Sequence, residues 1–280
     1  MNPDRTHGSR RPLRLLVALG VLSIGLAGCA DDEATRAEPV RTPGPVGSVD
    51  PSAVATTTVA APLNFIATAK AGVAVVKVHS SPNGPIEQLD IDENGTKRDV
   101  EIKSPTDAQV AAVFMVKQAG LTAGGSTWHE VYLPVRPNGS TGYIADTDVD
   151  LTSTDLSIHV SLSAHTLTVE QGSRPIISYR IAVGTAANPT PTGLYYIKEL
   201  VAPADPKGVY GPLAFGLSGH SDTIRDSAEF ADGVIAIHGT DHPELIGQDV
   251  SHGCIRLESE DILDLQKHAI PLGTPVTIAA

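Results

Sequence analysis

The chain has 280 residues and a formal net charge of −12, with 20 lysines and arginines against 32 aspartates and glutamates. A balance this acidic argues against nucleic acid as a partner, because the phosphate backbone repels negative charge. It also argues against electrostatic adhesion to anionic lipid. The sequence contains two cysteines, Cys29 and Cys254, in very different surroundings.

Residues 1–29 have the pattern of an export signal, with an arginine-rich start and an apolar or small run from Leu15 to Ala27. That run is too short to span a membrane comfortably. It ends in Leu26-Ala27-Gly28-Cys29, which resembles the cleavage box of bacterial lipoproteins. The resemblance implies that Cys29 is lipidated and anchors the protein to the outer face of the cytoplasmic membrane, in the bacterial cell envelope. The alternative is a plain signal peptide with an incidental cysteine.

Residues 30–62 are rich in Pro, Ala and Thr and lack a periodic apolar pattern, which predicts a linker. About thirty extended residues would span ~100 Å, enough to carry a domain well away from a membrane. The rest of the chain exceeds the commonest domain size, so we expect two domains, at residues 63–150 and 155–280.

Short β-rich runs alternate with turn signals between residues 63 and 150, which predicts a small all-β unit. Trp128, the only tryptophan, is expected in its core rather than stacked on a ligand. Trp128–Pro134 with Gly139–Ile144 resembles the end of the bacterial Src-homology-type barrels that accompany cell-wall enzymes. The expected strands are Val73–His79, Val100–Lys103, Val110–Lys117, His129–Val135 and Gly142–Ala145.

The second unit is also β-rich, with one helix near the C-terminus. Ser259 is the expected N-cap of that helix, and Ile262, Leu265 and Ala269 form its apolar stripe. The fold class is therefore mainly β: a small barrel-like unit, then a β-rich catalytic unit with one principal helix. The expected strands are Leu156–Leu162, Thr166–Glu170, Ile176–Val183, Leu194–Glu199, Leu213–Leu217, Val234–His238 and Pro275–Ala279.

Cys254 is a lone thiol between a glycine and an apolar residue, and His238 stands where the apolar run Val234–Ile237 gives way to a loop. Strand ends are common places for functional side chains. The two residues are the parts of a thiol and base pair, in which the imidazole takes the thiol proton and stabilises the thiolate as an ion pair. The alternative is a small, buried, structural cysteine.

His238-Gly239, a short loop and then Ser251-His252-Gly253-Cys254-Ile255-Arg256-Leu257 resemble the signature of the L,D-transpeptidase (YkuD-type) catalytic domain. Val183-Gly184-Thr185 with Pro189–Ile197 is similar to the early part of that family, and Gly211–Ser218 to its middle. The resemblance therefore covers residues 155–280.

The resemblance implies that Cys254 attacks the penultimate amide of a peptidoglycan tetrapeptide stem, releases D-alanine and forms a thioester. His238 would be the base, oriented by the carbonyl of Gly239, and the backbone amides of Gly253 and Cys254 would face the oxyanion. The acyl group would then pass to a diaminopimelate amine and cross-link the cell wall. Carbapenem acylation of the thiol is also implied, whereas a cofactor or an obligate protein partner is not.

Five further residues are candidates for substrate binding or for locking the loop. His252 hydrogen-bonds across the site or holds the loop. Arg256 grips a stem carboxylate, or pairs with an acid such as Asp249. Tyr210 and His220 line the substrate cleft or have packing roles. The five are Ser251, which we expect to bond the local backbone, with His252, Arg256, Tyr210 and His220.

A zinc site and two other functions are the alternatives to a transpeptidase. His238, His242, His252 and Cys254 offer zinc ligands, but no second cysteine supports a structural site, and we expect no metal. A thiol-dependent peptidoglycan hydrolase or carboxypeptidase would use water as the acceptor. A catalytically inactive wall-binding lipoprotein would only hold peptide, and the intact pair of His238 and Cys254 argues against it.

Overall fold

The computed structural model describes residues 63–225 and 233–280. All of the described residues belong to one compact unit. The expected export signal, the linker and the lipidation of Cys29 therefore lie outside the described residues. Within the described part, helices long and apolar enough to cross a membrane are absent.

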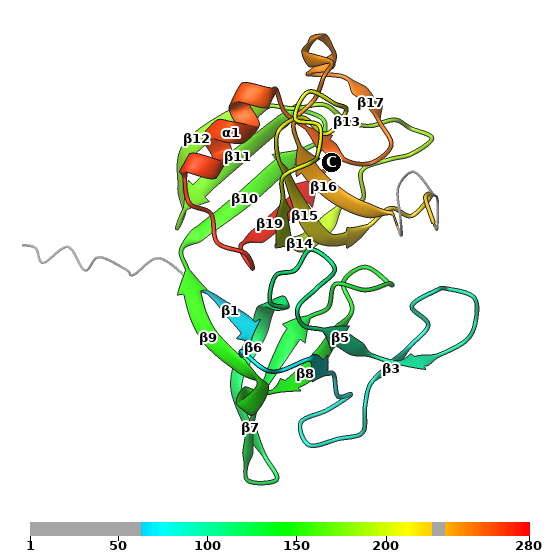
Figure 1. Cartoon of the computed structure of the whole chain (residues 1–280), viewed down its shortest axis with the longest axis vertical. Helices are drawn as coiled ribbons and strands as arrows, with labels where there is room; N and C mark the ends of the chain where they lie inside the picture. Colours follow the sequence, from blue (N-terminus) through cyan, green and yellow to red (C-terminus); the bar gives the residue numbers. More distant parts are fainter. Residues whose placement is uncertain (1–62, 226–232) are drawn as a thin grey trace, which may run out of the picture. The chain divides into compact units, whose positions relative to one another are not determined.

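Five antiparallel strands form the first sheet, in the order β8-β7-β6-β1-β9 (Figure 1). Two short pairs, β2 with β5 and β3 with β4, lie outside this sheet. The strands are β1 (Asn64–Ala69), β2 (Val75–Lys77), β3 (Gln88–Leu89), β4 (Arg98–Asp99), β5 (Glu101–Lys103), β6 (Val113–Ala123), β7 (Ser126–Tyr132), β8 (Thr141–Ala145) and β9 (Val149–Thr154), with a short 3₁₀ turn at Asp146–Asp148.

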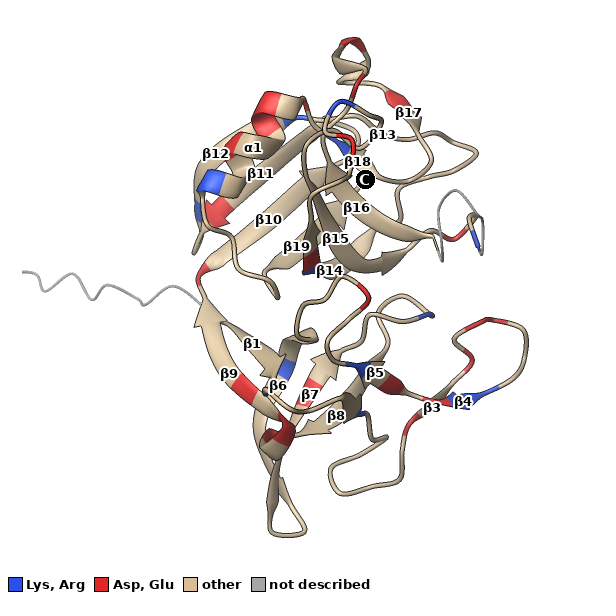
Figure 2. Cartoon of the chain, in the orientation of Figure 1, with Lys and Arg blue, Asp and Glu red and all other residues tan. Residues whose placement is uncertain are grey.

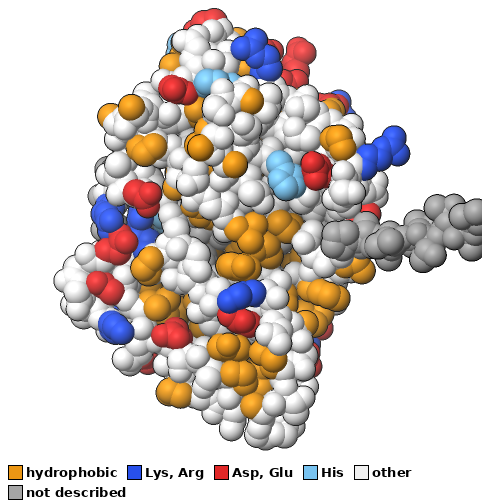
Figure 3. All heavy atoms as spheres, turned by 180° about the vertical axis from the view of Figure 1, so that it is seen from behind, with side chains coloured by type: hydrophobic (Ala, Val, Ile, Leu, Met, Phe, Trp, Pro, Cys, Tyr) orange, Lys and Arg blue, Asp and Glu red, His pale blue; other side chains and the backbone are white. Residues whose placement is uncertain are grey.

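The first sheet has its own core, in which Phe114, Val131 and Ile144 are fully buried. Trp128 is buried as expected, and its ring meets that of His79 edge to face at a centroid distance of 4.8 Å. Other apolar side chains of this unit stay exposed, Phe65 among them, and Figure 3 shows patches of hydrophobic side chains on the surface.

Eight strands form the second sheet, in the order β12-β11-β10-β19-β14-β15-β16-β18. It is mixed, because β10 pairs in parallel with β19 and β16 in parallel with β18. β13 and β17 form a separate parallel pair. The strands are β10 (Leu156–Ser161), β11 (Thr166–Gln171), β12 (Arg174–Arg180), β13 (Val183–Gly184), β14 (Gly193–Val201), β15 (Ala214–His220), β16 (Val234–His238), β17 (Asp249–Ser251), β18 (Ile255–Arg256) and β19 (Pro275–Ala279).

Helix α1 (Ser259–Lys267) buries Ile262 and Leu265 in the core of the second sheet. Acidic residues occupy its first turn (Figure 2), where they suit the positive end of the helix dipole. The described residues thus form a mainly β fold with one α-helix, which confirms the expected fold class.

Two details of the predicted helix are wrong. Glu258 occupies the N-cap position, and Ser259 is the first helical residue. The hydroxyl of Ser259 donates to the carbonyl oxygen of Thr240 at 3.0 Å, so a tertiary contact uses the group that would otherwise cap the helix. Ala269 lies beyond the helix, with a positive φ of 51° that ends the helical path.

Candidate active site

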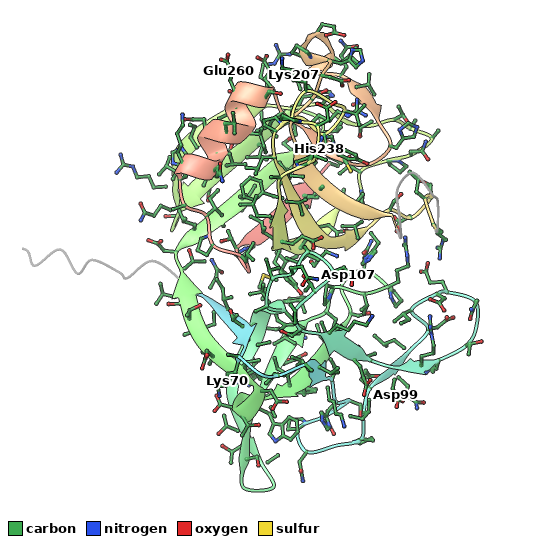
Figure 4. All side chains as sticks on the ribbon, in the orientation of Figure 1. Lys70, Asp99, Asp107, Lys207, His238 and Glu260 are labelled. Carbon is green, nitrogen blue, oxygen red and sulfur yellow. The ribbon has the colours of Figure 1, made fainter. Side chains whose placement is uncertain are left out.

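His238 is the last residue of β16, and its side chain is almost fully buried at 2% exposure (Figure 4). Its Nδ1 atom lies 2.6 Å from the carbonyl oxygen of Gly239. A carbonyl oxygen can only accept, so Nδ1 carries the proton and donates it. In the neutral imidazole the lone pair is therefore on Nε2, and the expected orienting contact from Gly239 is present.

Cys254 has a free, half-buried thiol and directly precedes β18. In the parallel pairing of β16 with β18, Ile237 aligns with Ile255 and His238 with Arg256. This register brings the two chain segments that carry the thiol and the imidazole to neighbouring positions, and both residues line one cavity of about 200 Å³. Its lining residues are Val209, Tyr210, Ser221, Ile224, Gly233, Val234, Ile235, His238, His252, Cys254 and Arg256.

The loop before the thiol is held by Ser251, whose side chain is buried. Its hydroxyl donates to the carbonyl oxygen of Cys254 at 2.6 Å and accepts from the backbone N–H of Gly253 at 3.1 Å. This is the local backbone role expected for Ser251. Gly253 has a φ of 117°, and a Cβ atom there would lie 3.0 Å from Cδ1 of Ile235. Glycine is therefore needed for both conformation and space.

The same loop changes the expectation for the oxyanion. The N–H of Gly253 is directed at Ser251, so its expected role as an oxyanion donor is not the arrangement seen here. Among the described residues, the backbone N–H of Cys254 has no acceptor. The amide of Cys254 is therefore the better placed of the two to meet a developing negative charge.

Burial sets the protonation of the pair. Burial lowers the pKa of His238 to about 4, while the hydrogen bond to Gly239 opposes the shift and the charge of Arg256 adds to it. Burial also raises the pKa of the Cys254 thiol, partly offset by the backbone N–H of Ala236 and by the charge of Arg256. Both shifts favour the neutral forms of the imidazole and the thiol over an imidazolium and thiolate pair.

Arg256 lines the cavity, and its buried Nε atom has no hydrogen-bond partner among the described residues. No ion pair joins Arg256 to Asp249 among the described residues, and the carboxylate of Asp249 lies 2.8 Å from Nε2 of His165. Tyr210 also lines the cavity, and its ring packs edge-on against that of His238 at a centroid distance of 5.0 Å. The guanidinium and the aromatic ring thus border the same space as the thiol.

The remaining candidate residues lie in different places. His252 is exposed where it lines the cavity, whereas His220 is buried and borders a different cavity, together with Arg136 and Arg225. His242 bonds Glu244 at 2.9 Å through Nδ1. Throughout residues 63–225 and 233–280, no three His, Cys, Asp or Glu side chains are arranged to hold a metal ion.

Ser221 and Ile224 also line the cavity and are not among the residues predicted from the sequence. Ser221 is buried and directly follows β15. A polar residue at the end of an apolar strand was the only available signal for it. Nothing in the local sequence marks Ile224.

Comparison with known proteins gives one family. The family described as the L,D-transpeptidase catalytic domain (YkuD) matches residues 155–278. A Bacillus subtilis protein, YkuD, which is named as an L,D-transpeptidase, is 35% identical over 161 residues, or 58% of this chain and 79% of that protein.

Two solved structures illustrate the range of similarity. Bd1075 of Bdellovibrio bacteriovorus is 27% identical with a TM-score of 0.35, covering 45% of this chain and 47% of that one, so this chain spans about half of its length. An L,D-transpeptidase from Mycobacterium smegmatis is 17% identical with a TM-score of 0.35, covering 59% of this chain and 96% of that one.

Proposed function

Because the chain belongs to the L,D-transpeptidase family, we propose that it cross-links peptidoglycan peptide stems by cysteine-dependent acyl transfer. The observation that carries the proposal is the pairing of His238 with Cys254 in one cavity. The imidazole has its lone pair on Nε2, and the thiol directly precedes β18, the parallel neighbour of β16. A base and a nucleophile that line the same cavity are what covalent acyl transfer requires.

Acylation begins with two neutral groups. Nε2 of His238 takes the thiol proton as the sulfur of Cys254 attacks the carbonyl carbon of the penultimate residue of a tetrapeptide stem. The backbone N–H of Cys254 donates to the resulting oxyanion. The C–N bond then breaks, the imidazolium returns its proton to the leaving amine, and D-alanine departs, leaving a thioester on Cys254.

Transfer reverses the roles. The side-chain amine of diaminopimelate on a second stem attacks the thioester carbonyl, and His238 accepts the proton that this amine loses. The C–S bond breaks, the sulfur takes the proton back from the imidazolium, and an amide joins the two stems. Each cycle consumes one peptide bond and makes one, so no external energy source is needed.

Arg256 suits an acidic substrate. Its charge acts on both reacting groups, and its buried Nε atom lacks a hydrogen-bond partner among the described residues. A stem carboxylate that enters the cavity would satisfy this donor and neutralise the charge. An acidic stem peptide is therefore the substrate class that the cavity favours.

Mass spectrometry of the intact protein tests the proposal. A carbapenem should add its mass to the wild-type chain, the adduct should be absent from Cys254→Ala, and it should form more slowly in His238→Gln. His242→Gln is the matched control, because its imidazole is exposed and bonds Glu244. Absence of an adduct on folded, reduced wild-type protein would sink the nucleophile assignment and favour a wall-binding protein.

The products distinguish transferase from hydrolase. With a tetrapeptide stem as the only substrate, the transpeptidase should release D-alanine and give a cross-linked dimer. A carboxypeptidase would release D-alanine and leave only tripeptide, because water then takes the acyl group.

We also propose that Cys29 carries the lipid that holds the enzyme at the outer face of the cytoplasmic membrane. The support is the sequence of residues 1–29, with its apolar run ending in Leu26-Ala27-Gly28-Cys29. In cells fed a labelled fatty acid, the wild-type chain should acquire label and Cys29→Ala should not. Label on the variant would place the lipid elsewhere.

A further inference from the structure

The connection between β7 and β8 reaches the segment that borders the active-site cavity. Residues 220–224, here called the wall segment, begin at the last residue of β15, and Ser221 and Ile224 of this segment line the cavity with Cys254 and His238. Residues 133–140 connect β7 to β8 in the first sheet. Two side chains of this connection, Arg136 and Asn138, bond the backbone of the wall segment.

Arg136 is buried at 8% exposure, and its guanidinium forks between two carbonyl groups of the wall segment. Nη1 donates to the carbonyl oxygen of Ser221 at 2.8 Å, and Nη2 donates to that of Ile224 at 3.0 Å. A planar guanidinium fixes the separation and orientation of two acceptors, which a lysine cannot do. The fork therefore sets the distance between the two residues that line the cavity.

Asn138 pairs with the backbone of His220 in both directions. Its Nδ2 donates to the carbonyl oxygen of His220 at 2.7 Å, and its Oδ1 accepts from the N–H of His220 at 2.9 Å. The side-chain amide thus makes the donor and acceptor bonds that a neighbouring strand would otherwise make with His220. The first residue of the wall segment, which is also the last residue of β15, is held in this way.

The opposite side of the wall segment is held by the strand that carries the proposed base. The N–H of Ser221 donates to the carbonyl oxygen of Gly233 at 2.8 Å, and β16 follows with His238 at its end. A Cβ atom at Gly233 would lie 2.3 Å from the carbonyl oxygen of Ile224 and 3.1 Å from Nη2 of Arg136. The guanidinium, the wall segment and the start of β16 are therefore in close contact.

We propose that Arg136 and Asn138 are positioning residues for acyl transfer: they hold the wall segment so that it seats the stem peptide against Cys254. The inference rests on the proposed function for its kinetic consequence, and on the four hydrogen bonds alone for its structural part. The connection between β7 and β8 then supports substrate binding although it does not line the cavity itself. Misplacement of a substrate by about 1 Å can cost about 100-fold in rate, so loss of this support should be measurable.

Asn138→Ala and Asn64→Ala form a matched pair for the test. Nδ2 of Asn64 also donates across to the second sheet, to the carbonyl oxygen of Leu156 at 3.3 Å, but Asn64 does not line the cavity. Asn138→Asp keeps the acceptor and loses the donor, and Arg136→Lys keeps the charge and loses the fork. The proposal predicts a smaller loss of acylation in Asn138→Asp than in Asn138→Ala. It predicts no loss in Asn64→Ala.

Two measurements on the full chain decide the proposal. Hydrogen exchange of peptides that cover residues 214–225 should speed up in Asn138→Ala and Arg136→Lys, but not in Asn64→Ala. Acylation by a tetrapeptide stem should fall about tenfold in kcat/KM, mainly through KM, while alkylation of Cys254 by iodoacetamide changes less than twofold.

The outcomes separate cleanly. Unchanged exchange in both variants would overturn the structural part, and faster exchange with unchanged kcat/KM would overturn the positioning role. An equal loss of iodoacetamide reactivity would indicate general damage to the fold and also overturn it. If wild-type protein is not acylated by the stem, the proposed function fails. The hydrogen-exchange comparison then still decides whether residues 133–140 hold the wall segment.

Discussion

The Nδ1 atom of His238 lies 2.6 Å from the carbonyl oxygen of Gly239, the residue that follows it in the chain. A hydrogen bond to the next residue in the chain therefore fixes the tautomer of the imidazole. Burial also determines its protonation, since it lowers the pKa of His238 to about 4. The imidazole is thus a neutral acceptor over the whole physiological range.

The rate of Cys254 alkylation should keep rising above neutral pH. The thiolate is the reactive form, and burial raises the pKa of this thiol. Rates with iodoacetamide should therefore climb through about pH 8.5, the ordinary thiol pKa, without a plateau below it. His238→Gln should give the same profile. A plateau from about pH 5 to 8 would indicate a preformed thiolate and contradict the neutral pair.

Acid should destabilise the fold through His238. The unfolded residue takes up a proton near its ordinary pKa of 6.5, whereas the folded one does so only near 4, so protons favour unfolding between these values. Stability is retained above 6.5 and lost as pH falls toward 4. From pH 7 to 5, wild type should lose about 2 kcal/mol more unfolding free energy than His238→Gln in urea titrations. Equal losses would disprove burial of the neutral form.

Ser251→Ala should weaken both the fold and acylation. The substitution removes the donor to the buried Cys254 carbonyl and the acceptor of the Gly253 N–H, at a cost of about 1–3 kcal/mol. Urea unfolding measures the loss, and carbapenem adduct formation should slow. Ser80→Ala is the control, since its exposed hydroxyl makes only a 3.4 Å bond to Pro85, and its effect should stay within about 0.5 kcal/mol. Similar effects of the two substitutions would show that the hydrogen bonds of Ser251 do not stabilise the loop before Cys254.

Gly253→Ala should abolish acylation. Its φ of 117° is costly for alanine, and the added Cβ would meet Ile235 at 3.0 Å beside the thiol. Gly125→Ala is matched for positive φ, at 79°, but has open space around its Cβ. It should lose about 1 kcal/mol of stability and keep wild-type adduct formation. A carbapenem adduct on Gly253→Ala at the normal rate would show that the loop tolerates a side chain.

The sequence was most informative where strands are buried runs. Val234–His238 and Pro275–Ala279 have the predicted bounds, because continuous apolar residues bounded by polar or turn residues mark such strands. β1 and β9 had no such signal. Asn64–Ala69 and Val149–Thr154 mix polar residues with apolar ones and lack a clear alternation. The pairing of β1 with both β6 and β9 makes them strands.

The chemistry of the site was only partly readable. The types and spacing of His238 and Cys254 indicated the pair, but their protonation depends on burial, which a linear pattern does not contain. Arg136 was invisible as a neighbour of the cavity, because it lies 85 residues from Ser221 in sequence. The assignment of catalytic roles to individual residues remains a prediction for the experiments above.

Arg256 also joins both its neighbours in the sheet, since its backbone aligns with His238 on one side and exchanges N–H and carbonyl bonds with Ala182 on the other. The backbone of Arg256 therefore has little conformational freedom, and the same holds for β16, which ends at His238. Most of the conformational entropy of this part of the site is lost when the chain folds, before any ligand arrives. Small ligands should consequently bind with high efficiency per atom, because little of their interaction free energy is consumed in ordering the protein.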